Sequence, residues 1–273
     1  MATGTPNEPA GALPPASGGR LRSVRRLTQR KHRVESGEFL AEGPQAVREA
    51  IEYARVRELY VVPSPRVRDL VDAAARAAIP AYSVAEPELN RLTDTINPQG
   101  VVAVCSWPPA TLADLPADAR LVVVCAQIRD PGNAGTVIRC ADAFGADAVI
   151  LSADSVEVTN PKVVRASVGS IFHLPVITGV PLAAAITELK RRGLQVLAAE
   201  GGGADQLDRL ADAGELARPT AWVMGNEAWG LPPEHAALAD RRVAVPIWGA
   251  AESLNLATAA AVCLYATGSA QRR

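Results

Sequence analysis

The sequence has few of the residues that build disulfide frameworks and metal sites. Its 273 residues include four cysteines and three histidines. The cysteines stand far apart without a Cys-x-x-Cys pair, and the histidines are scattered at positions 32, 173 and 235. This spacing argues against a disulfide-rich secreted domain and against a zinc site. We therefore expect a cytoplasmic protein with reduced cysteines and no metal.

Long apolar runs are also missing. The longest, such as Leu121–Ala126, are far shorter than the roughly 20 residues that a membrane span needs. The segment Met1–Gly19 lacks the apolar core of a secretory signal. Because 48% of the residues are hydrophobic and the net charge is −1, overall disorder is excluded. We expect one large or two smaller folded domains and no membrane partner.

The near-neutral net charge hides an uneven distribution. Seven cations fall within the fourteen residues from Arg20 to Arg33, and no acid follows them before Glu35. Such a cluster is typical of a surface that binds a polyanion. Six of the seven are arginines, whose planar guanidinium suits phosphate better than the point charge of lysine. A solvated basic helix face is the alternative, and charge alone leaves both open.

Composition divides the chain into four parts. Residues 1–19 are rich in Gly, Pro, Ala and Ser, which predicts a disordered tail. Residues 20–105 alternate strand and helix patterns, as in a small α/β domain. Residues 106–119 contain two consecutive prolines and are interpreted as a linker. A second α/β alternation fills residues 120–273.

The strands expected in this second domain are nearly continuous apolar runs. That character predicts a parallel sheet covered by helices on both faces. We expect strands at 121–125, 148–151, 174–177, 195–199, 221–224 and 243–245. We expect helices at 134–144, 161–167, 182–191 and 254–266.

The first motif, Arg129–Arg139, leads from a strand through a Pro-Gly-Asn turn into a helix. Asn133 is a plausible N-cap of that helix. Arg139 follows six residues later between Ile138 and Cys140. A permanent cation on an apolar helix is costly unless it meets an anion or faces a cleft. The motif is therefore a candidate anion site.

Two further motifs follow predicted strands. Trp222–Pro232 runs from a buried strand into a glycine-containing loop with Glu227. Glycine permits close approach of a ligand to the backbone, and parallel sheets bind ligands beyond the carboxyl ends of their strands. In Val245–Ala259, Ser253 is expected to cap a long apolar helix, with the Asn255 amide in its first turn.

In this order, the three motifs resemble those of the SpoU/TrmH family of RNA ribose 2′-O-methyltransferases, within the SPOUT superfamily. The resemblance covers 121 to about 266, and more weakly 27–105 through Arg30-Lys31 and Phe39–Gly43, which are similar to the family's substrate-binding domain. It implies an α/β fold with a deep trefoil knot, S-adenosyl-L-methionine as cofactor, and a homodimer. The implied substrate is a ribose 2′-hydroxyl of RNA, 23S rRNA rather than tRNA.

The resemblance also implies roles for individual residues. The catalytic set would be Asn133, Arg139, Glu227, Ser253 and Asn255. The cofactor would be held by Leu197, Ala199, Gly201, Gly225, Val245, Ile247 and Leu254. RNA would be bound by Arg22, Arg25, Arg26, Arg30, Lys31 and Arg165. Because a guanidinium hardly deprotonates in proteins, we expect Arg139 to bind phosphate or stabilise an alkoxide rather than to accept a proton.

Two departures and two rival functions stay open. Trp229 and Trp248 are bulky where the family's motif loops often carry smaller residues, so they either stack on a base or pack at the dimer interface. One rival is a SPOUT-like protein that binds RNA without methylating it. The other is a nucleotide-dependent α/β enzyme, but the sequence has no P-loop, Gly-x-Ser-x-Gly or early Gly-x-Gly-x-x-Gly motif.

Overall fold

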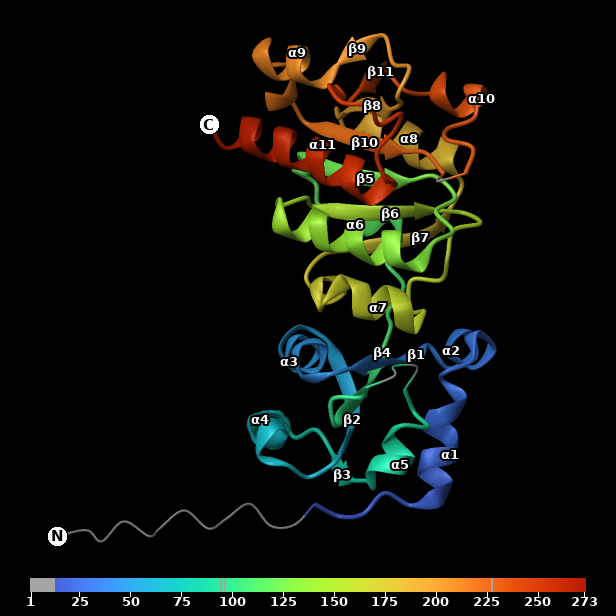
Figure 1. The fold of residues 1–273 in the computed structure, drawn as a ribbon, viewed down its shortest axis with the longest axis vertical. Helices are drawn as coiled ribbons and strands as arrows, with labels where there is room; N and C mark the ends of the chain where they lie inside the picture. Colours follow the sequence, from blue (N-terminus) through green and yellow to red (C-terminus); the bar gives the residue numbers. More distant parts are fainter. Residues whose placement is uncertain (1–12, 94, 96, 227) are drawn as a thin grey trace, which may run out of the picture. The chain divides into compact units, whose positions relative to one another are not determined.

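A computed structural model describes residues 13–93, 95, 97–226 and 228–273. The chain divides into two compact units, Met1–Trp107 and Pro108–Arg273 (Figure 1). Across the described ranges, no helix combines the length and apolar character needed to cross a membrane.

The N-terminal unit is built on a mixed four-stranded sheet. Its strand order is β1-β4-β2-β3, with β4 antiparallel to β1 and β2 and with β3 parallel to β2. The strands are β1 (Glu38–Glu42), β2 (Arg55–Val61), β3 (Ala81–Ser83) and β4 (Val101–Ser106). The helices are α1 (Gly18–Arg26), α2 (Arg30–Ser36), α3 (Pro44–Tyr53), α4 (Arg68–Arg76) and α5 (Glu86–Leu89). In Figure 1, α3 and α4 lie on one side of this sheet and α1 and α5 on the other.

The segment before α1 corrects one prediction. The Ser83 backbone N–H donates to the Pro14 carbonyl at 2.9 Å, and the Ala16 N–H donates to the Ser83 carbonyl at 3.0 Å. Ser17 then caps α1 with its side chain. The predicted disordered tail is therefore wrong for residues 13–19, because the free edge of β3 offers backbone partners that composition does not reveal. Residues 1–12 of that tail lie outside the described residues.

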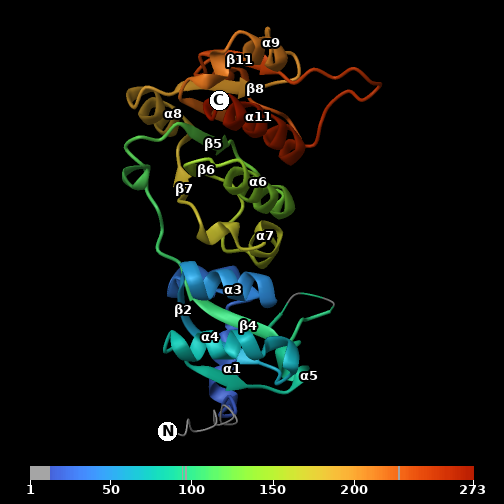
Figure 2. The same cartoon turned by 90° about the vertical axis from the view of Figure 1, so that its left-hand side faces the viewer.

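The C-terminal unit is built on a seven-stranded sheet in the order β7-β6-β5-β10-β8-β11-β9, and every pairing in it is parallel. The strands are β5 (Leu121–Cys125), β6 (Ala148–Ser152), β7 (Val176–Val180), β8 (Gln195–Ala199), β9 (Asp205–Gln206), β10 (Thr220–Met224) and β11 (Arg241–Ala244). In Figure 2, α8 lies on one side of this sheet, and α6 and α11 lie on the other. The predicted parallel sheet with two covered faces is confirmed.

All four helices expected in this unit are present, and the last of them extends five residues further than predicted. The short helices at 207–212 and 233–236 were not expected. The helices are α6 (Pro131–Ala143), α7 (Pro161–Ser167), α8 (Leu182–Arg191), α9 (Leu207–Asp212), α10 (Pro233–Ala236) and α11 (Leu256–Gln271). The bounds of α7 and α8 match the prediction, whereas α6 begins three residues earlier than expected and α11 two residues later. Short 3-10 turns lie at Pro65–Val67, Leu112–Asp114, Ser170–Phe172 and Glu215–Ala217.

Both faces of the C-terminal sheet are sealed by apolar packing. On one face Val124, Ile150 and Val223 pack in a cluster with Ile186 and Leu189 of α8. Trp222, fully buried in β10, donates its indole N–H to the Thr267 hydroxyl of α11 at 2.9 Å. Each fully buried valine, isoleucine or leucine side chain stabilises the fold by roughly 1.5 to 3 kcal/mol. The sheet is therefore a rigid base for the loops that leave its carboxyl edge.

Most of the segment predicted as a linker belongs to the C-terminal unit. Ala110 forms a bridge with Ile177, and Leu115 is buried in the core. The Arg192 guanidinium donates to the carbonyls of Leu112 and Leu115 at 3.0 and 2.7 Å. The sequence could not show this, because the carbonyl partners lie about 80 residues before the arginine.

Arg192 should therefore stabilise the C-terminal unit. Its side chain is 17% exposed, pairs with Glu188 at 2.7 Å and binds carbonyls that would otherwise lose their donor. We expect Arg192→Ala to lower the free energy of unfolding by about 2 to 3 kcal/mol, measured by chemical denaturation.

Arg191 gives the matched control, because it pairs with the same carboxylate of Glu188 but its side chain is 68% exposed. Together Arg191 and Arg192 lower the pKa of Glu188 to about 2. Arg191→Ala should leave the unfolding transition nearly unchanged. Equal losses in both variants would show that the ion pair, and not the contact with the 112–116 segment, stabilises the unit.

Candidate functional site

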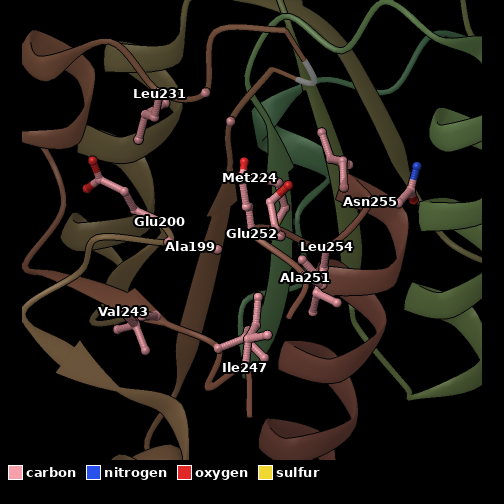
Figure 3. Close-up of a pocket in the computed structure, with 18 of the residues that line it drawn as sticks. Ala199, Glu200, Met224, Leu231, Val243, Ile247, Ala251, Glu252, Leu254 and Asn255 are labelled. Carbon is pink, nitrogen blue, oxygen red and sulfur yellow. The ribbon is translucent and has the colours of Figure 1, made fainter. Parts of the chain in front are cut away.

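A pocket of about 770 Å³ opens at the carboxyl edge of the C-terminal sheet. It is bounded by the segments that follow β8, β10 and β11 and by the start of α11 (Figure 3). The strands are parallel, so their carboxyl ends meet at one edge and their loops gather there. The volume falls in the range of about 300 to 1,000 Å³ that is typical of small-molecule sites.

The pocket collects most of the residues predicted to bind a cofactor. Six of the seven line it, namely Ala199, Gly201, Gly225, Val245, Ile247 and Leu254. Leu197 does not, because it lies inside β8 between β10 and β11 and is buried in the sheet. The prediction for Leu197 was wrong because the sequence does not show where the strand ends and the pocket loop begins, and Leu197 lies before that point.

The lining also contains residues to which the sequence motifs gave no individual role. Glu200, Gln206 and Glu252 contribute polar side chains, and Met224 and Leu231 contribute apolar ones. Glu200 lies 3.9 Å from Arg242 at its nearest nitrogen. Among the described lining residues two are carboxylates and none is lysine or arginine, so the pocket favours a ligand with positive charge.

Three of the predicted catalytic residues, Asn133, Ser253 and Asn255, line the same pocket. The Asn255 side-chain oxygen accepts from the backbone N–H groups of Ala257 and Thr258, which makes Asn255 the N-cap of α11. Its amide nitrogen donates to the Asn133 side-chain oxygen at 3.0 Å, across 122 residues of sequence. One amide therefore both starts α11 and holds it against α6.

Both sequence-based cap assignments are corrected. Asp130 caps α6, since its carboxylate accepts from the Asn133 N–H at 2.7 Å. Pro131 occupies the first helical position, which suits its fixed φ and missing N–H, so the cap falls one residue before it. Ser253 lies exposed before Asn255 and does not cap α11. The two asparagine side chains thus meet at the pocket, where they bond to each other.

The starts of α6 and α11 give this end of the pocket a partial positive character. Each helix N-terminus carries the positive end of the helix dipole, with some of its N–H groups bound by the caps Asp130 and Asn255. The Asn133–Asn255 bond brings the two N-termini together. This end of the pocket can stabilise an anion or a developing negative charge, whereas the part lined by Glu200 and Glu252 favours positive charge.

Arg139 does not join the pocket of its own chain. It is exposed on α6 and is not among the lining residues. An α-helix turns about 100° per residue, so a side chain six residues after Asn133 points about 240° around the axis and lies about 9 Å further along. Arg139 and Asn255 therefore do not converge within one chain, and the sequence leaves open which copy of the chain supplies the arginine. Glu227, the third member of that expected cluster, lies outside the described residues.

Asn226 ties together three strand ends. Its side-chain amide donates to the Gln127 carbonyl at 2.6 Å, and its side-chain oxygen accepts from the Ala228 N–H at 2.8 Å. The Gln127 N–H in turn donates to the Ser152 hydroxyl, with Gln127 at a φ of +52°. This network fixes the ends of β10, β5 and β6 beside the pocket. The sequence motifs assigned no individual role to Asn226, although its position between Gly225 and Glu227 in the second motif could have indicated one.

The two motif glycines at the pocket differ in why glycine is needed there. A Cβ at Gly225 would lie 2.5 Å from the Gly230 carbonyl carbon, so the two arms of that loop need glycine to close. A Cβ at Gly201 would meet nothing within 4 Å. The expected close approach to a ligand therefore remains possible at Gly201, while Gly225 has a structural cause.

The arginine run of the N-terminal unit splits into two groups. Arg20 pairs with Glu58 and lies 4.2 Å over the Tyr82 ring, and buried Arg33 donates to the carbonyls of Leu27 and Thr28. The five cations predicted to bind RNA there are all exposed, namely Arg22, Arg25, Arg26, Arg30 and Lys31.

The last predicted RNA-binding residue, Arg165, lies partly buried on α7. The described residues contain no group of three or more His, Cys, Asp or Glu that could hold a metal. Burial raises the pKa of the Cys263 thiol to about 12, and the four cysteines are free.

Comparison with known proteins links this geometry to RNA methylation. Residues 120–265 match the SpoU rRNA Methylase family, and residues 19–103 match an MRM3-like substrate binding domain. The chain is 34% identical to the 23S rRNA (guanosine(2553)-2′-O)-methyltransferase RlmP of Bacillus subtilis, over 90% of this chain and 94% of that protein. It is 32% identical to a 23S rRNA (uridine(2479)-2′-O)-methyltransferase of Streptomyces viridochromogenes, over 88% and 85%.

Solved structures agree along nearly the whole chain. The SpoU methyltransferase AviRb of Streptomyces viridochromogenes superposes with a TM-score of 0.82 at 28% identity, covering 93% of this chain and 98% of that one. An AdoMet-bound rRNA methyltransferase of Sinorhizobium meliloti gives a TM-score of 0.79 at 30% identity, covering 93% and 96%.

The double role of Asn255 can be separated by substitution. Asn255→Ala removes both the cap and the bond to Asn133, and we expect the free energy of unfolding to fall by about 1 to 2 kcal/mol. Asn255→Ser keeps a capping oxygen but lacks the reach to Asn133, so most of the stability should remain. If the serine variant loses as much as the alanine variant in thermal or chemical unfolding, the bond between the two helices outweighs the cap.

Proposed function

Because the chain belongs to the SpoU rRNA Methylase family, we propose that it transfers a methyl group from S-adenosyl-L-methionine to a ribose 2′-hydroxyl of 23S rRNA. The observation that carries the proposal is the pocket at the sheet edge, which is bounded by residues of all three sequence motifs. The relatives named above act on 23S rRNA at different nucleotides, so the nucleotide is not fixed by the family.

The residues of the pocket fit this cofactor. Ala199, Leu231 and Ile247 offer an apolar slot for an adenine ring. The carboxylates of Glu200 and Glu252 suit a ligand with sulfonium and ammonium charges. When bound, the cofactor supplies an already activated methyl group. The protein's own task is therefore to align the ribose and to stabilise charge on its 2′ oxygen.

Asn133 and Asn255 are proposed to orient the ribose. They stand where the N-termini of α6 and α11 meet, so backbone dipoles there stabilise negative charge that develops on the 2′ oxygen. Ser253 and Glu227 are proposed to complete the site, with Glu227 orienting the arginine and the ribose. Arg139 is proposed to bind phosphate or to stabilise the alkoxide as a permanent cation.

The exposure of Arg139 supports a homodimer in which α6 of one copy faces the pocket of the other. We also propose the deep trefoil knot of the family for the C-terminal unit. Its support is the strand order, since β11 lies between β8 and β9 while the following α11 packs beside α6 through Asn255. We also propose a cytoplasmic location, because the proposed substrate is ribosomal RNA.

The proposal is tested by calorimetry with S-adenosyl-L-methionine, followed by mapping of 2′-O-methyl groups in 23S rRNA and tRNA treated with the protein. One new methylated ribose in 23S rRNA is expected. Cofactor binding with methylation of tRNA alone would identify a tRNA enzyme. RNA binding with neither cofactor binding nor methylation would identify an RNA-binding protein of the same fold.

Arg139 should contribute to turnover and not to folding. We expect Arg139→Lys to lower kcat by about 10² to 10³, because the amine cannot reproduce the forked contacts of the guanidinium. The same substitution at exposed Arg191 should leave kcat unchanged. Near-wild-type turnover of Arg139→Lys with unchanged RNA affinity would exclude a specific guanidinium role.

A site built from Arg139 of one copy and Asn255 of the other can be distinguished from a site within one copy by mixing two variants. Mixing Arg139→Lys with Asn255→Ser protomers should restore part of the activity, because one of the two sites in the mixed dimer keeps both residues. No restoration in mixed dimers would assign Arg139 to the pocket of its own chain.

The exposed cations of α1 and α2 are proposed to hold RNA phosphates. Deleting them by truncation would also remove buried Val24 and Leu27, so substitutions are the better test. We expect the pair Arg22→Gln and Arg25→Gln to lower RNA affinity and to reduce the slope of log K against log salt by roughly 1.5 to 2. The same changes at exposed Arg68 and Arg76 of α4 remove equal charge from another helix of this unit. An equal slope change in both pairs would mean that net charge alone steers RNA binding.

A further inference from the structure

Two of the four tryptophans have large exposed surfaces. Trp222 is fully buried, and Trp107 packs edge-on against Phe39 with ring centroids 5.8 Å apart. In contrast, Trp248 is 88% exposed and Trp229 is 54% exposed. An indole has a large apolar surface, and when it is exposed to water it adds no hydrophobic stabilisation to the fold. These two side chains are therefore candidates for contact with a bound molecule.

Both exposed indoles belong to loops that line the pocket. Trp248 lies between two lining stretches, 245–247 and 251–256, at the outer part of the segment that joins β11 to α11. Trp229 lies between the lining residues Asn226 and Gly230. Those two residues exchange backbone hydrogen bonds at 2.8 and 2.9 Å, which close the loop under Trp229. Two separate loops that line the pocket thus each carry an exposed aromatic ring.

We propose that Trp248, assisted by Trp229, stacks on the nucleobase of the nucleotide whose ribose enters the pocket; this rests on the proposed function. A ribose inside a base-paired helix is hard to bring into a pocket, so the target nucleotide must be unstacked or single-stranded. An aromatic side chain then replaces the stacking that the base has lost, and it does so for every base because each has a π-face. Trp248 and Trp229 are thereby positioning residues, separate from the groups that contact the reacting oxygen.

Trp248 lies in an uncharged segment. Val245 to Ala251 carry no charge, so the exposed ring stands in an apolar stretch on which the face of a base can stack. A different exposed apolar surface is available to a second copy of the chain. It lies on α11, where Val262 and Tyr265 are exposed and Tyr265 packs against Phe144.

The test compares RNA with and without bases. The probes are a 12-nucleotide oligo(A) and a ribose-phosphate 12-mer of the same charge that lacks bases, with affinity measured by anisotropy of an end label. We expect Trp248→Ala to weaken oligo(A) binding by about 5- to 150-fold and Trp248→Phe to weaken it much less. Neither variant should alter binding of the abasic 12-mer.

Fluorescence gives a readout that a structural role would not move. Oligo(A) should quench the indole emission of the wild-type protein, the abasic 12-mer should not, and most of the quenching should vanish in Trp248→Phe. Calorimetry with S-adenosyl-L-methionine on each variant should match the wild type, which shows that the pocket is intact.

Two results would overturn the proposal. Equal loss of affinity for both 12-mers, or loss for neither, would exclude base stacking. Sedimentation that shows Trp248→Ala dissociating a dimer, with oligo(A) affinity unchanged, would assign the indole to a contact between copies of the chain. A wild-type protein that binds oligo(A) through Trp248 but methylates no RNA would contradict the proposed function and leave the stacking assignment standing.

Discussion

The hydrogen bond between Asn255 and Asn133 is the constraint on which the pocket depends. It joins two helix starts that lie 122 residues apart, and the same Asn255 side chain caps α11. The start of α11 fixes where the preceding loop ends, and that loop forms one wall of the pocket. The geometry of the site therefore follows from one amide that satisfies three partners, since its oxygen accepts from two backbone N–H groups while its nitrogen donates to α6.

The parallel sheet explains why distant motifs meet at all. β10 lies between β5 and β8, and β11 lies on the far side of β8. With every strand pointing the same way, the segments after β8, β10 and β11 emerge at one edge, and Asn226 links that edge to the end of β5 through Gln127. The pocket combines carboxylates on its walls with two helix N-termini at one end. Such a division suits a cationic donor beside an oxygen that gains negative charge.

The sequence predicted what depends on local apolar patterning and missed what depends on orientation. The run Leu121–Cys125 and the helix Leu182–Arg191 were predicted with their observed bounds, because continuous burial and amphipathic spacing leave a direct trace. The caps at Asn133 and Ser253 were wrong, since a cap is set by the residue at which the helix begins. Arg139 was placed in the pocket by its motif, but helix rotation turns its side chain elsewhere.

Residues of the same type differ widely in burial and in partners among the cations and the tryptophans. Arg20 and Arg33 stand in the same basic run as their neighbours, yet they are occupied by Glu58 and by the carbonyls that end α1. Trp222 is a core residue, whereas Trp248 of the same residue type is almost wholly exposed. A count of arginines or tryptophans cannot separate these cases, because each side chain is defined by partners distant in sequence. The RNA-binding role proposed for the exposed cations of α1 and α2 therefore depends on their exposure in the fold, which a count of arginines does not give.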